Sequence, residues 1–383
     1  MPRYIEEQLM SKDIHQGLII ESLNNYLKWN NLPFTMNESG ICHGLAIVYA
    51  KMHAQGRDED FKKILGYIAG TMRPDLEMAT QLNHFIADLL ISFDPVVFDK
   101  QLSQEHGPSM IGIGGKALKT PLKIAMTLYD DDWAELIEEL DLKDKETFLV
   151  SSVYHSVSVS KQDGVYTVYD PNYIKGFKTF NNENSLVKEL HENVFRYKKG
   201  PIGLYLSIIT SPMEEQRQLP KQIDLYKQYV KSDHVFLEAE AKESGKSVFN
   251  TLVQSASFCD VDVCNYLINI GADHISEATK KAISKNNYKV VPTLLTHIKR
   301  GSDLIEPIGL ALLCGRKESF DAIMESEHGE AMFCELIDDQ SMRLLFIRYA
   351  AEGGNDLLLM HVTREIIEDI KSKLKEQLKN QYL

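Results

Sequence analysis

The chain lacks a hydrophobic run that is long enough to cross a bilayer. A spanning helix needs roughly 18 or more consecutive apolar residues, and no stretch of the 383 residues reaches that length. The N-terminal segment, MPRYIEEQLMSKDIHQG, mixes charges of both signs and has no long apolar centre, which argues against a Sec-type signal peptide. We therefore expect no membrane span and no Sec-dependent export.

Positive charge is also scarce. The chain has 42 Lys and Arg residues against 55 Asp and Glu residues, which gives a formal net charge of -13. A protein that binds the phosphates of nucleic acid or an anionic membrane surface normally carries a basic excess or a basic stripe. The balance therefore argues against nucleic acid and anionic membranes as general partners.

Cysteine is rare, and its spacing forms no framework. The number of cysteines is odd, and none of the spacings is typical of a zinc site or of a disulfide scaffold. The glycine-rich segment IGIGGKALKTP, 111–121, lacks the spacing of a phosphate loop; we interpret it as a tight loop near the cleft that contains Cys42, which is discussed below. We expect a reducing compartment, no metal and no cofactor. The five cysteines are Cys42, Cys259, Cys264, Cys314 and Cys334.

The composition is otherwise that of a globular protein, with 44% hydrophobic and 25% charged residues. A chain of this length exceeds one core of usual size, so about two domains are expected. A polar segment with two prolines, SPMEEQRQLPKQ, covers 211–222. We place the domain boundary there, which gives one domain at 1–215 and a second at 220–383.

The first domain is predicted to begin with helices and to end with an antiparallel sheet, an α+β arrangement. Helical periodicity is predicted over 4–30 and 42–54 and, with interruptions, over 60–145. The last of these interrupted helical patterns is LKIAMTLYDDDWAELIEEL. Period-two alternation begins at Val153, a hairpin turn is predicted at Asp163-Gly164, and VYTVYD is the return strand. FKTF and GLYLSIIT are predicted as two further strands.

The second domain contains a repeated helical pattern and no predicted strand. Small residues stand where paired helices approach each other closely, namely Ser255, Ala282, Ala311 and Ala350. Turn positions carry residues that tolerate positive φ, namely Asn286, Gly315 and Gly354. The copies lie at 250–273, 280–298, 308–326 and 347–362.

The first copy, NTLVQSASFCDVDVCNYLINIGAD, resembles an ankyrin repeat, and the other three are weaker echoes. The resemblance implies an all-α ankyrin-type solenoid with a protein-binding surface, closed by an amphipathic C-terminal helix, REIIEDIKSKLKEQLKNQ. The alternative is a generic array of helical hairpins.

Cys42 stands at the start of a nearly uninterrupted apolar segment, GICHGLAIVYA, after Ser39 and Gly40. We expect it in the first turn of a buried helix, where the helix dipole and unpaired N–H groups lower the pKa of a thiol. A buried cysteine is also commonly structural. The segment alone leaves a nucleophile and a structural residue both open.

The predicted hairpin brings further polar residues together. With a two-residue turn at Asp163-Gly164, Asp170 lies opposite Val157, and Asn172 lies opposite His155. His155 and Asp170 are then diagonal neighbours within side-chain reach. A carboxylate beside the imidazole fixes its tautomer and stabilises the imidazolium that forms when it accepts a thiol proton. Asn172 is an alternative orienting residue.

The order cysteine, histidine, aspartate resembles the papain-like proteases. GICHGLAIVYA, HSVSVS and VYTVYDPNYIKGFKTF together resemble the three motif blocks of the YopT-type bacterial effector proteases, over roughly 30–210. The resemblance implies a papain-like domain with Cys42 as nucleophile, His155 as general base and acid, and Asp170 as its orienting partner. Such enzymes usually add an amide before the cysteine to complete an oxyanion hole.

Asn37 is the nearest amide to Cys42 in the sequence and is our oxyanion-hole candidate, with Asn31 as an alternative. His43, next to the cysteine, is unusual for the family, and we expect a structural role for it.

The resemblance also implies a biological setting. Such proteins are secreted by a specialised bacterial secretion system into the host cell cytoplasm, where they act on host proteins. An attached ankyrin module is similar to that of ankyrin-containing effectors of the Legionella type. We therefore expect a thiol protease whose repeats bind the target.

Two alternatives stay open. The same triad can serve a glutamine deamidase or an acyltransferase, or the domain can be a catalytically inactive scaffold. The sequence does not name the substrate, the cleavage site, the partner of the repeats or the oligomeric state.

Overall fold

The computed structural model describes residues 13–32, 35–36, 40–70, 76–99, 102–242 and 248–381. The chain divides into two compact units. The first comprises Met1–Phe98 and Gln104–Thr251, and the second comprises Asp99–Ser103 and Leu252–Leu383. Among the described helices, none combines the length and the apolar character that crossing a membrane requires.

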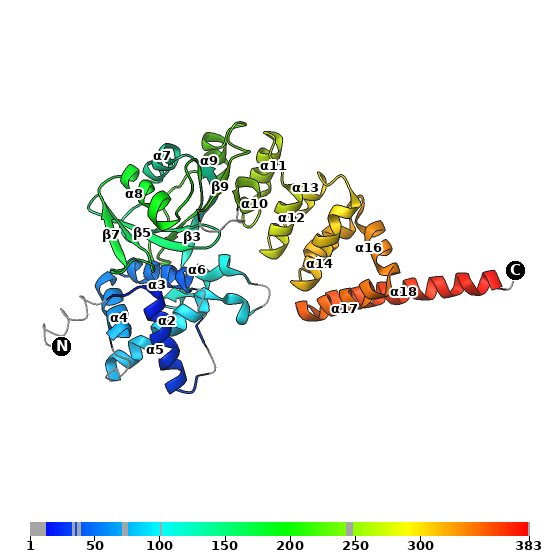
Figure 1. Ribbon diagram of the computed structural model, residues 1–383, viewed down its shortest axis with the longest axis horizontal. Coiled ribbons are helices and arrows are strands. Elements are labelled where there is room, and N and C mark those ends of the chain that lie inside the picture. Colours follow the sequence, from blue (N-terminus) through cyan, green and yellow to red (C-terminus); the bar gives the residue numbers. More distant parts are fainter. Residues whose placement is uncertain are drawn as a thin grey trace. The chain divides into compact units, whose positions relative to one another are not determined.

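A six-stranded antiparallel sheet forms the centre of the first unit (Figure 1). The strands follow one another in sequence order across the sheet except for β8, the last strand in the chain to join it, which lies between β3 and β4. The predicted antiparallel sheet is thus present, and its last two strands include FKTF and GLYLSIIT. In spatial order the strands are β3 (Lys119–Leu128), β8 (Ile202–Thr210), β4 (Thr147–Ser151), β5 (Ser156–Gln162), β6 (Val165–Tyr169) and β7 (Phe177–Phe180).

Helices lie on both sides of this sheet (Figure 1). The buried helix α3 packs across β4, β5 and β8, with α4 and α5 against it. On the other side lie α7, α8 and α9. The helices of this unit are α2 (Gln16–Trp29), α3 (Cys42–Ala54), α4 (Asp58–Gly70), α5 (Leu76–Phe93), α6 (Gly107–Met110), α7 (Asp130–Leu140), α8 (Glu183–Glu189) and α9 (Gln222–Tyr229), with short turns η1 (Pro95–Val97), η2 (Gln104–His106) and η3 (Leu190–Val194).

Serines on β5 allow α3 to approach the sheet closely. Ser158 donates a hydrogen bond of 2.7 Å to the Ala46 carbonyl in the middle of α3. One turn further along, Tyr49 and Ser160 share a hydrogen bond of 2.9 Å. Small side chains with a hydroxyl satisfy polar groups at this interface and leave room for the helix backbone. The Ser/Val alternation of the strand therefore fixes which face α3 covers.

The helix predicted through LKIAMTL is wrong. Residues Lys119–Leu128 form β3, and only Asp130–Leu140 is helical. The strand is buried almost throughout its second half, so it carries a continuous apolar run rather than an alternating one. A short continuous run has no period that separates a buried strand from a buried helix.

The strand predicted from Val153 is also different in the structure. Residues Thr147–Ser151 form β4, and β5 begins at Ser156, so the segment is a hairpin with Ser151 opposite Ser156. His155 lies in the turn just before β5. The next hairpin has the predicted register, since Gln162 pairs with Val165 and Ser158 with Tyr169. Asp163 and Gly164 both have positive φ, as its two-residue turn requires.

The helix predicted over 4–30 begins later among the described residues. His15 is extended and precedes α2, which runs from Gln16 to Trp29. Residues 4–12 lie outside the described part of the chain. The glycine-rich segment forms a small hairpin, β1 (Gly112–Ile113) with β2 (Lys116–Ala117), around Gly114 and Gly115. It lines a cavity behind α3 rather than the one beside Cys42.

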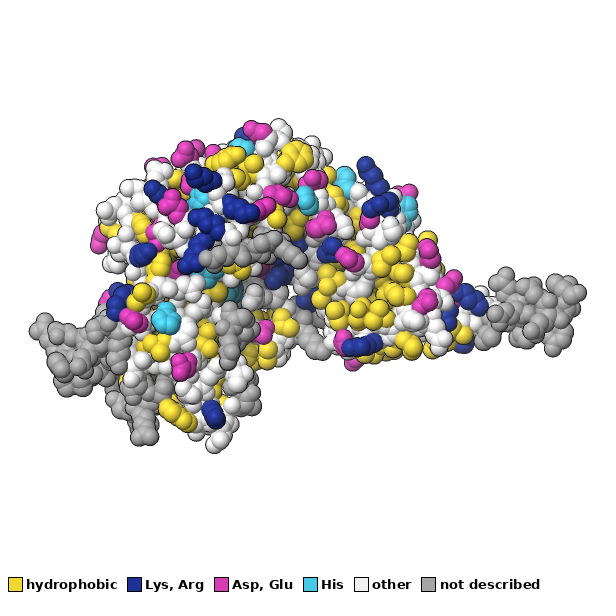
Figure 2. Space-filling view, in the orientation of Figure 1, with side chains coloured by type: hydrophobic (Ala, Val, Ile, Leu, Met, Phe, Trp, Pro, Cys, Tyr) yellow, Lys and Arg dark blue, Asp and Glu magenta, His cyan; other side chains and the backbone are white. Residues whose placement is uncertain are grey.

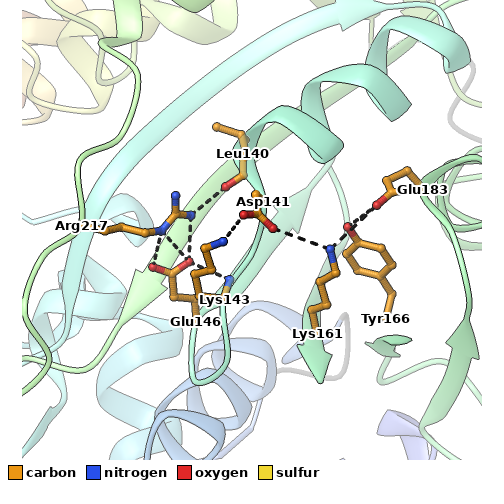
Figure 3. A network of polar contacts seen from close by, with 8 residues as sticks. All are labelled: Leu140, Asp141, Lys143, Glu146, Lys161, Tyr166, Glu183 and Arg217. Atoms are coloured by element: carbon orange, nitrogen blue, oxygen red, sulfur yellow. Dashed lines mark hydrogen bonds and ion pairs between the residues drawn. The ribbon is translucent and has the colours of Figure 1, made fainter. Parts of the chain in front are cut away.

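The polar segment 211–222 lies inside the first unit, not at its edge. Arg217 forms an ion pair of 2.9 Å with Glu146 and donates 2.7 Å to the Leu140 carbonyl (Figure 3). Beyond this segment, α9 and a two-stranded sheet of β9 (Glu238–Glu240) and β10 (Val248–Asn250) still belong to the first unit. The expectation of no strands after the prolines was therefore wrong.

The described part of the second unit contains helices joined by short turns and no strand (Figure 1). Its helices stack in two rows, with α12 on α14 and α14 on α17 in one row and α11 on α13 and α13 on α15 in the other. The elements are α10 (Thr251–Ser255), α11 (Val261–Asn269), α12 (Ile275–Ser284), α13 (Val291–Leu295), η4 (Gly301–Leu304), α14 (Ile305–Leu313), α15 (Lys317–Met324), α16 (Gly329–Asp338), α17 (Gln340–Gly353) and α18 (Asp356–Gln381).

The predicted repeat positions behave as their chemistry requires. The four small residues, Ser255, Ala282, Ala311 and Ala350, are fully buried. The turn residues Asn286, Gly315 and Gly354 all have positive φ, between 61 and 67°. Stacked helical hairpins are therefore present. Hydrophobic side chains gather on the surface where α14 and α17 lie (Figure 2).

Candidate active site

A cavity of about 510 Å³ opens beside Cys42 in the first unit. It brings together residues from α2, the start of α3, the turn before β5, the loop after β6 and the segment after α8. The lining residues are Gln16, Cys42, Tyr154, His155, Asp170, Asn172, Tyr173, Asn193, Val194, Phe195 and Arg196. Cys42, His155 and Asp170, which are far apart in the sequence, therefore share one cleft.

Cys42 is the first residue of α3, and Ile41 is its N-cap. The first N–H groups of a helix have no intrahelical acceptor. Among the described residues none accepts a hydrogen bond from the Cys42 N–H. The Cys42 sulfur itself accepts hydrogen bonds from the backbone N–H groups of His43 and Ser156. These two hydrogen-bond donors favour the ionised form of the Cys42 thiol.

His155 and Asp170 form a buried pair. The distance from His155 Nε2 to Asp170 Oδ1 is 2.8 Å, and the two side chains are 5% and 3% exposed. Asp170 also accepts a bond of 2.8 Å from the Asn172 backbone N–H. Because Asp170 takes Nε2, the ring nitrogen left for the Cys42 sulfur is Nδ1. The Asn172 side-chain nitrogen lies 3.3 Å from Nε2, farther than the carboxylate.

The electrostatics of the cluster favour a thiolate beside an imidazolium. Burial raises the pKa of the Cys42 thiol, but its hydrogen bond to His155, the charge of His155 and the two backbone donors outweigh burial and bring the pKa below its ordinary value. For His155, burial lowers the pKa, whereas the bonds to Asp170 and Cys42 raise it to about 9. Charges that stabilise each other in this way form a pair over the neutral pH range.

The loop between β6 and β7 is held by backbone bonds at both ends. Asp170 N–H donates to the Gly176 carbonyl at 2.9 Å, and α2 docks on the loop through Gln16 N–H to the Pro171 carbonyl at 2.6 Å. Just before α2, the Ile14 N–H donates a hydrogen bond of 2.8 Å to the Ile174 carbonyl of the same loop. The start of α2 and the residues after Asp170 are therefore one wall of the cleft.

Gln16 connects this wall to the nucleophile. Its Oε1 accepts a bond of 3.2 Å from the Ile41 N–H, immediately before Cys42, and its Nε2 donates to Asn172 Oδ1. An amide nitrogen carries two N–H groups, so one remains for another acceptor. A side-chain amide donor together with the backbone N–H of the nucleophile is the usual composition of an oxyanion hole.

Two other amides were selected from the sequence, Asn37 and Asn31. Asn37 lies outside the described residues. Asn31 follows the C-terminal end of α2, whereas Gln16 begins that helix. The 14 residues of α2 separate its two ends by roughly 20 Å. Gln16 was missed because its amide comes from another helix, and nothing in its local sequence distinguishes it.

His43 has a structural environment. Its Nδ1 lies 3.1 Å from Ser156 Oγ and its Nε2 lies 3.1 Å from the Gln104 carbonyl. Ser156 also bonds to Ser151 across the β4–β5 hairpin at 2.8 Å. The ring therefore joins the start of α3 to the sheet, as expected for a structural residue.

The opposite wall of the cleft follows α8. The chain there makes a π-helical turn, η3, and Arg196 adopts positive φ at 48°. Tyr154 hydroxyl donates to the Phe195 carbonyl, and the Phe195 ring packs edge-on against His155 at 6.0 Å between centroids. Such irregular backbone is often found at functional sites. Among the described residues, no three His, Cys, Asp or Glu side chains are grouped to hold a metal ion.

Comparison with known proteins finds little. No protein-family model and no curated protein matches the chain. One solved structure with a match is titled "Crystal Structure of Pseudomonas Avirulence Protein AvrPphB". The match has 13% sequence identity and a TM-score of 0.29, and it covers 44% of this chain and 91% of the other.

Proposed function

We propose that the first unit is a papain-like cysteine protease domain in which Cys42, His155 and Asp170 form the catalytic triad. One observation carries the proposal. The only described cysteine hydrogen-bonded to a histidine stands at a helix N-terminus, and that histidine bonds a buried carboxylate at 2.8 Å. This is the arrangement of nucleophile, base and orienting group that activates a thiol for acyl transfer.

The reaction divides into two steps. The Cys42 thiolate attacks the carbonyl carbon of a peptide bond, the C–N bond breaks, and the His155 imidazolium gives its proton to the leaving amine. The acyl group stays on the sulfur. His155 then takes a proton from water, whose oxygen attacks the thioester carbonyl and releases the new carboxyl end and the thiolate.

Two donors of the cleft suit the oxyanion of each tetrahedral intermediate. They are the N–H of Cys42, which no described residue accepts, and the second N–H of Gln16 Nε2. Donors that are already in place stabilise this charge without reorganisation, which is commonly the largest single contribution to such catalysis. We assign Gln16, rather than Asn37, as the side-chain donor.

The wider role rests on the resemblance of the sequence motifs. We propose a bacterial effector that a specialised secretion system delivers to the host cell cytoplasm, where it cleaves a host protein. The stacked hairpins of the second unit are proposed as ankyrin-type repeats that bind the target. Fully buried small residues between helices and positive-φ turns support this part of the proposal.

The test measures the reactivity of the thiol. Wild-type Cys42 should be alkylated by iodoacetamide at neutral pH far faster than Cys42 in a His155→Ala variant, and Cys334, which is exposed, is an internal control. Equal rates at Cys42 in the two proteins would exclude the activated thiol. Mass spectrometry of host proteins then compares wild type with Cys42→Ala.

New chain ends that depend on Cys42 support the protease. A gain of about one dalton on glutamine without a cut would indicate deamidation by the same acyl-enzyme chemistry.

A further inference from the structure

The second unit contains a groove that the proposed catalysis does not use. It is a hollow of about 780 Å³ between the end of α15, the helix α16 and the middle of α18. Its floor is apolar, with Phe333 and Ile337 almost completely buried and Met324 half-buried. Neither lysine nor arginine lines it.

The rim of the groove carries six carboxylates, of which two form ion pairs with neighbouring cations. Glu365 pairs with Arg364, and Asp369 pairs with Arg343 and Lys373. The other four rim carboxylates are exposed, and among the described residues none has an ion pair or a hydrogen bond. These four are Glu325, Glu327, Glu330 and Glu368.

The negative potential extends to the lining. Burial raises the pKa of the Cys334 thiol, and the charges of Glu330, Asp369, Asp338 and Glu365 raise it further. A groove of this kind discriminates between partners. An acidic segment is repelled, and a wholly apolar helix would take solvent from four unpaired carboxylates without replacing it. Lysine and arginine stems cover apolar surface while their heads reach the rim.

We propose that this groove binds a basic amphipathic segment of a protein partner, with apolar side chains on the Phe333–Ile337 floor and Lys or Arg heads against Glu325, Glu327, Glu330 and Glu368. This deepens the partner-binding role proposed for the second unit. It needs no catalytic activity, so binding and cleavage fail independently.

The test is a fluorescence-anisotropy titration of the full chain with labelled peptides. The main probe is a peptide of about four helical turns, with Leu at i, i+3, i+4 and i+7 spacing and Lys elsewhere. A second peptide has Glu in place of Lys, and a third has Gln in place of Leu. We expect binding of the first alone at micromolar concentration, with weakening as salt screens the rim.

Two quadruple variants separate the groove from general attraction. Glu325→Gln, Glu327→Gln, Glu330→Gln and Glu368→Gln together should raise the Kd for the first peptide by about tenfold or more, since each exposed pair contributes modestly. The matched control is Asp262→Asn, Glu277→Gln, Glu318→Gln and Glu335→Gln. These are exposed acids of the same unit outside the groove lining, and Glu335 is on the same helix, α16. The control removes the same charge and should leave the Kd within about twofold.

Several results would overturn the proposal. They are equal weakening in both variants, equal binding of the acidic peptide, or displacement of the peptide by millimolar Ca²⁺. If sedimentation shows a dimer and the dimer does not bind the peptide, a second copy of the chain, and not a basic segment of another protein, occupies the groove. If the groove variant unfolds, a photo-crosslinking version of the first peptide on wild type decides, because cross-links outside 324–337 and 361–372 contradict the site.

Discussion

At the scale of single residues, the charge state of Cys42 and His155 is set by burial on one side and by hydrogen bonds on the other. Burial alone would neutralise both Cys42 and His155, since it penalises any charge. Hydrogen bonds among Cys42, His155 and Asp170 reverse this outcome for both groups. The pair therefore holds two charges of opposite sign where either alone would be costly.

A pH profile follows from these shifts. Hydrolysis requires the thiolate and the imidazolium together, so kcat/KM should rise on an acid limb below the ordinary thiol pKa and fall on an alkaline limb near pH 9, where His155 loses its proton. Asp170→Asn removes a charge that raises the His155 pKa, so the alkaline limb should move to lower pH. The measurement is kcat/KM on a fluorogenic peptide from pH 4 to 10. An unchanged alkaline limb in Asp170→Asn would contradict the assignment of His155.

Gln16 offers a second residue-scale prediction. Gln16→Ala should lower kcat by about 10²–10³-fold with a small change in KM, the usual effect of losing one oxyanion donor. Gln16→Glu keeps an oxygen for the Ile41 N–H but removes the amide donor. Both variants should therefore lose kcat with little change in melting temperature, whereas a purely structural role predicts a lower melting temperature, since both variants lose the bond to Asn172. Steady-state kinetics with a thermal melt of each variant distinguish these outcomes.

At the scale of elements, the position of Cys42 depends on how closely α3 and α5 approach each other. Gly44 is two residues after the cysteine, and a Cβ there would lie 2.8 Å from Phe93 Cβ and 3.0 Å from the Leu89 carbonyl oxygen. Backbone on the far side of the contact cannot rotate away, so the helix itself would have to move. The glycine of CHG thus has a packing reason that is unrelated to the chemistry of its neighbour.

Gly44→Ala should accordingly destabilise the first unit by about 1–3 kcal/mol, as overpacking of a core does. The matched control is Gly17→Ala in α2, where the nearest contact of an added Cβ is an ordinary 3.4 Å from the His15 ring. Urea unfolding should show a lower midpoint for Gly44→Ala and an unchanged or slightly higher one for Gly17→Ala. Equal midpoints would show that α5 can shift to accept the added Cβ without loss of stability, which contradicts the prediction.

The turns between the stacked hairpins give another element-scale test. Gly315 has φ 65°, and a Cβ on it would lie 2.3 Å from the Gly353 carbonyl oxygen. Gly315→Ala should cost about 1–3 kcal/mol through strain and this clash. Asn286→Gly at an equivalent turn keeps positive φ available and should change stability little. Thermal unfolding followed by circular dichroism compares the two.

At the scale of the whole molecule, the first unit extends past the prolines at 212 and 220. The Tyr226 hydroxyl of α9 accepts a hydrogen bond from the Ala125 N–H and donates one to the Ala125 carbonyl, both at 3.0 Å. It thus satisfies backbone groups on the outer edge of β3, the first strand of the sheet. Phe249 of β10 is fully buried against Gly203 of β8, and Thr251 accepts a bond of 2.9 Å from the Thr127 N–H. These contacts lie beyond the boundary expected at 215–220.

Two fragments test this boundary. A chain ending at 251 should unfold cooperatively with a Tm well above that of a chain ending at 215, which lacks the side chains that cover β3 and β8. Loss of a buried Phe such as Phe249 alone costs about 3–5 kcal/mol. Differential scanning calorimetry and gel filtration make the comparison. A fragment 1–215 that melts at the same temperature would favour the earlier boundary.

Local pattern was sufficient for part of this protein. The turn at Asp163-Gly164 and the register of its hairpin are local, because a two-residue turn dictates which residues face each other. The start of α3 at Cys42 is local as well, since Gly40 precedes a strongly helical segment. From these two features the sequence by itself determined that His155 and Asp170 come together, and it nominated Cys42 as the third member.

Only the tertiary structure decided the rest. A buried central strand such as β3 has no polar face, so its sequence lacks the alternation that distinguishes a strand from a helix. Gln16 reaches the nucleophile through α2 and the loop after Asp170, and the end of the first unit is set by what covers β3 and β8. Such contacts join residues that are distant in the chain, and no local periodicity records them.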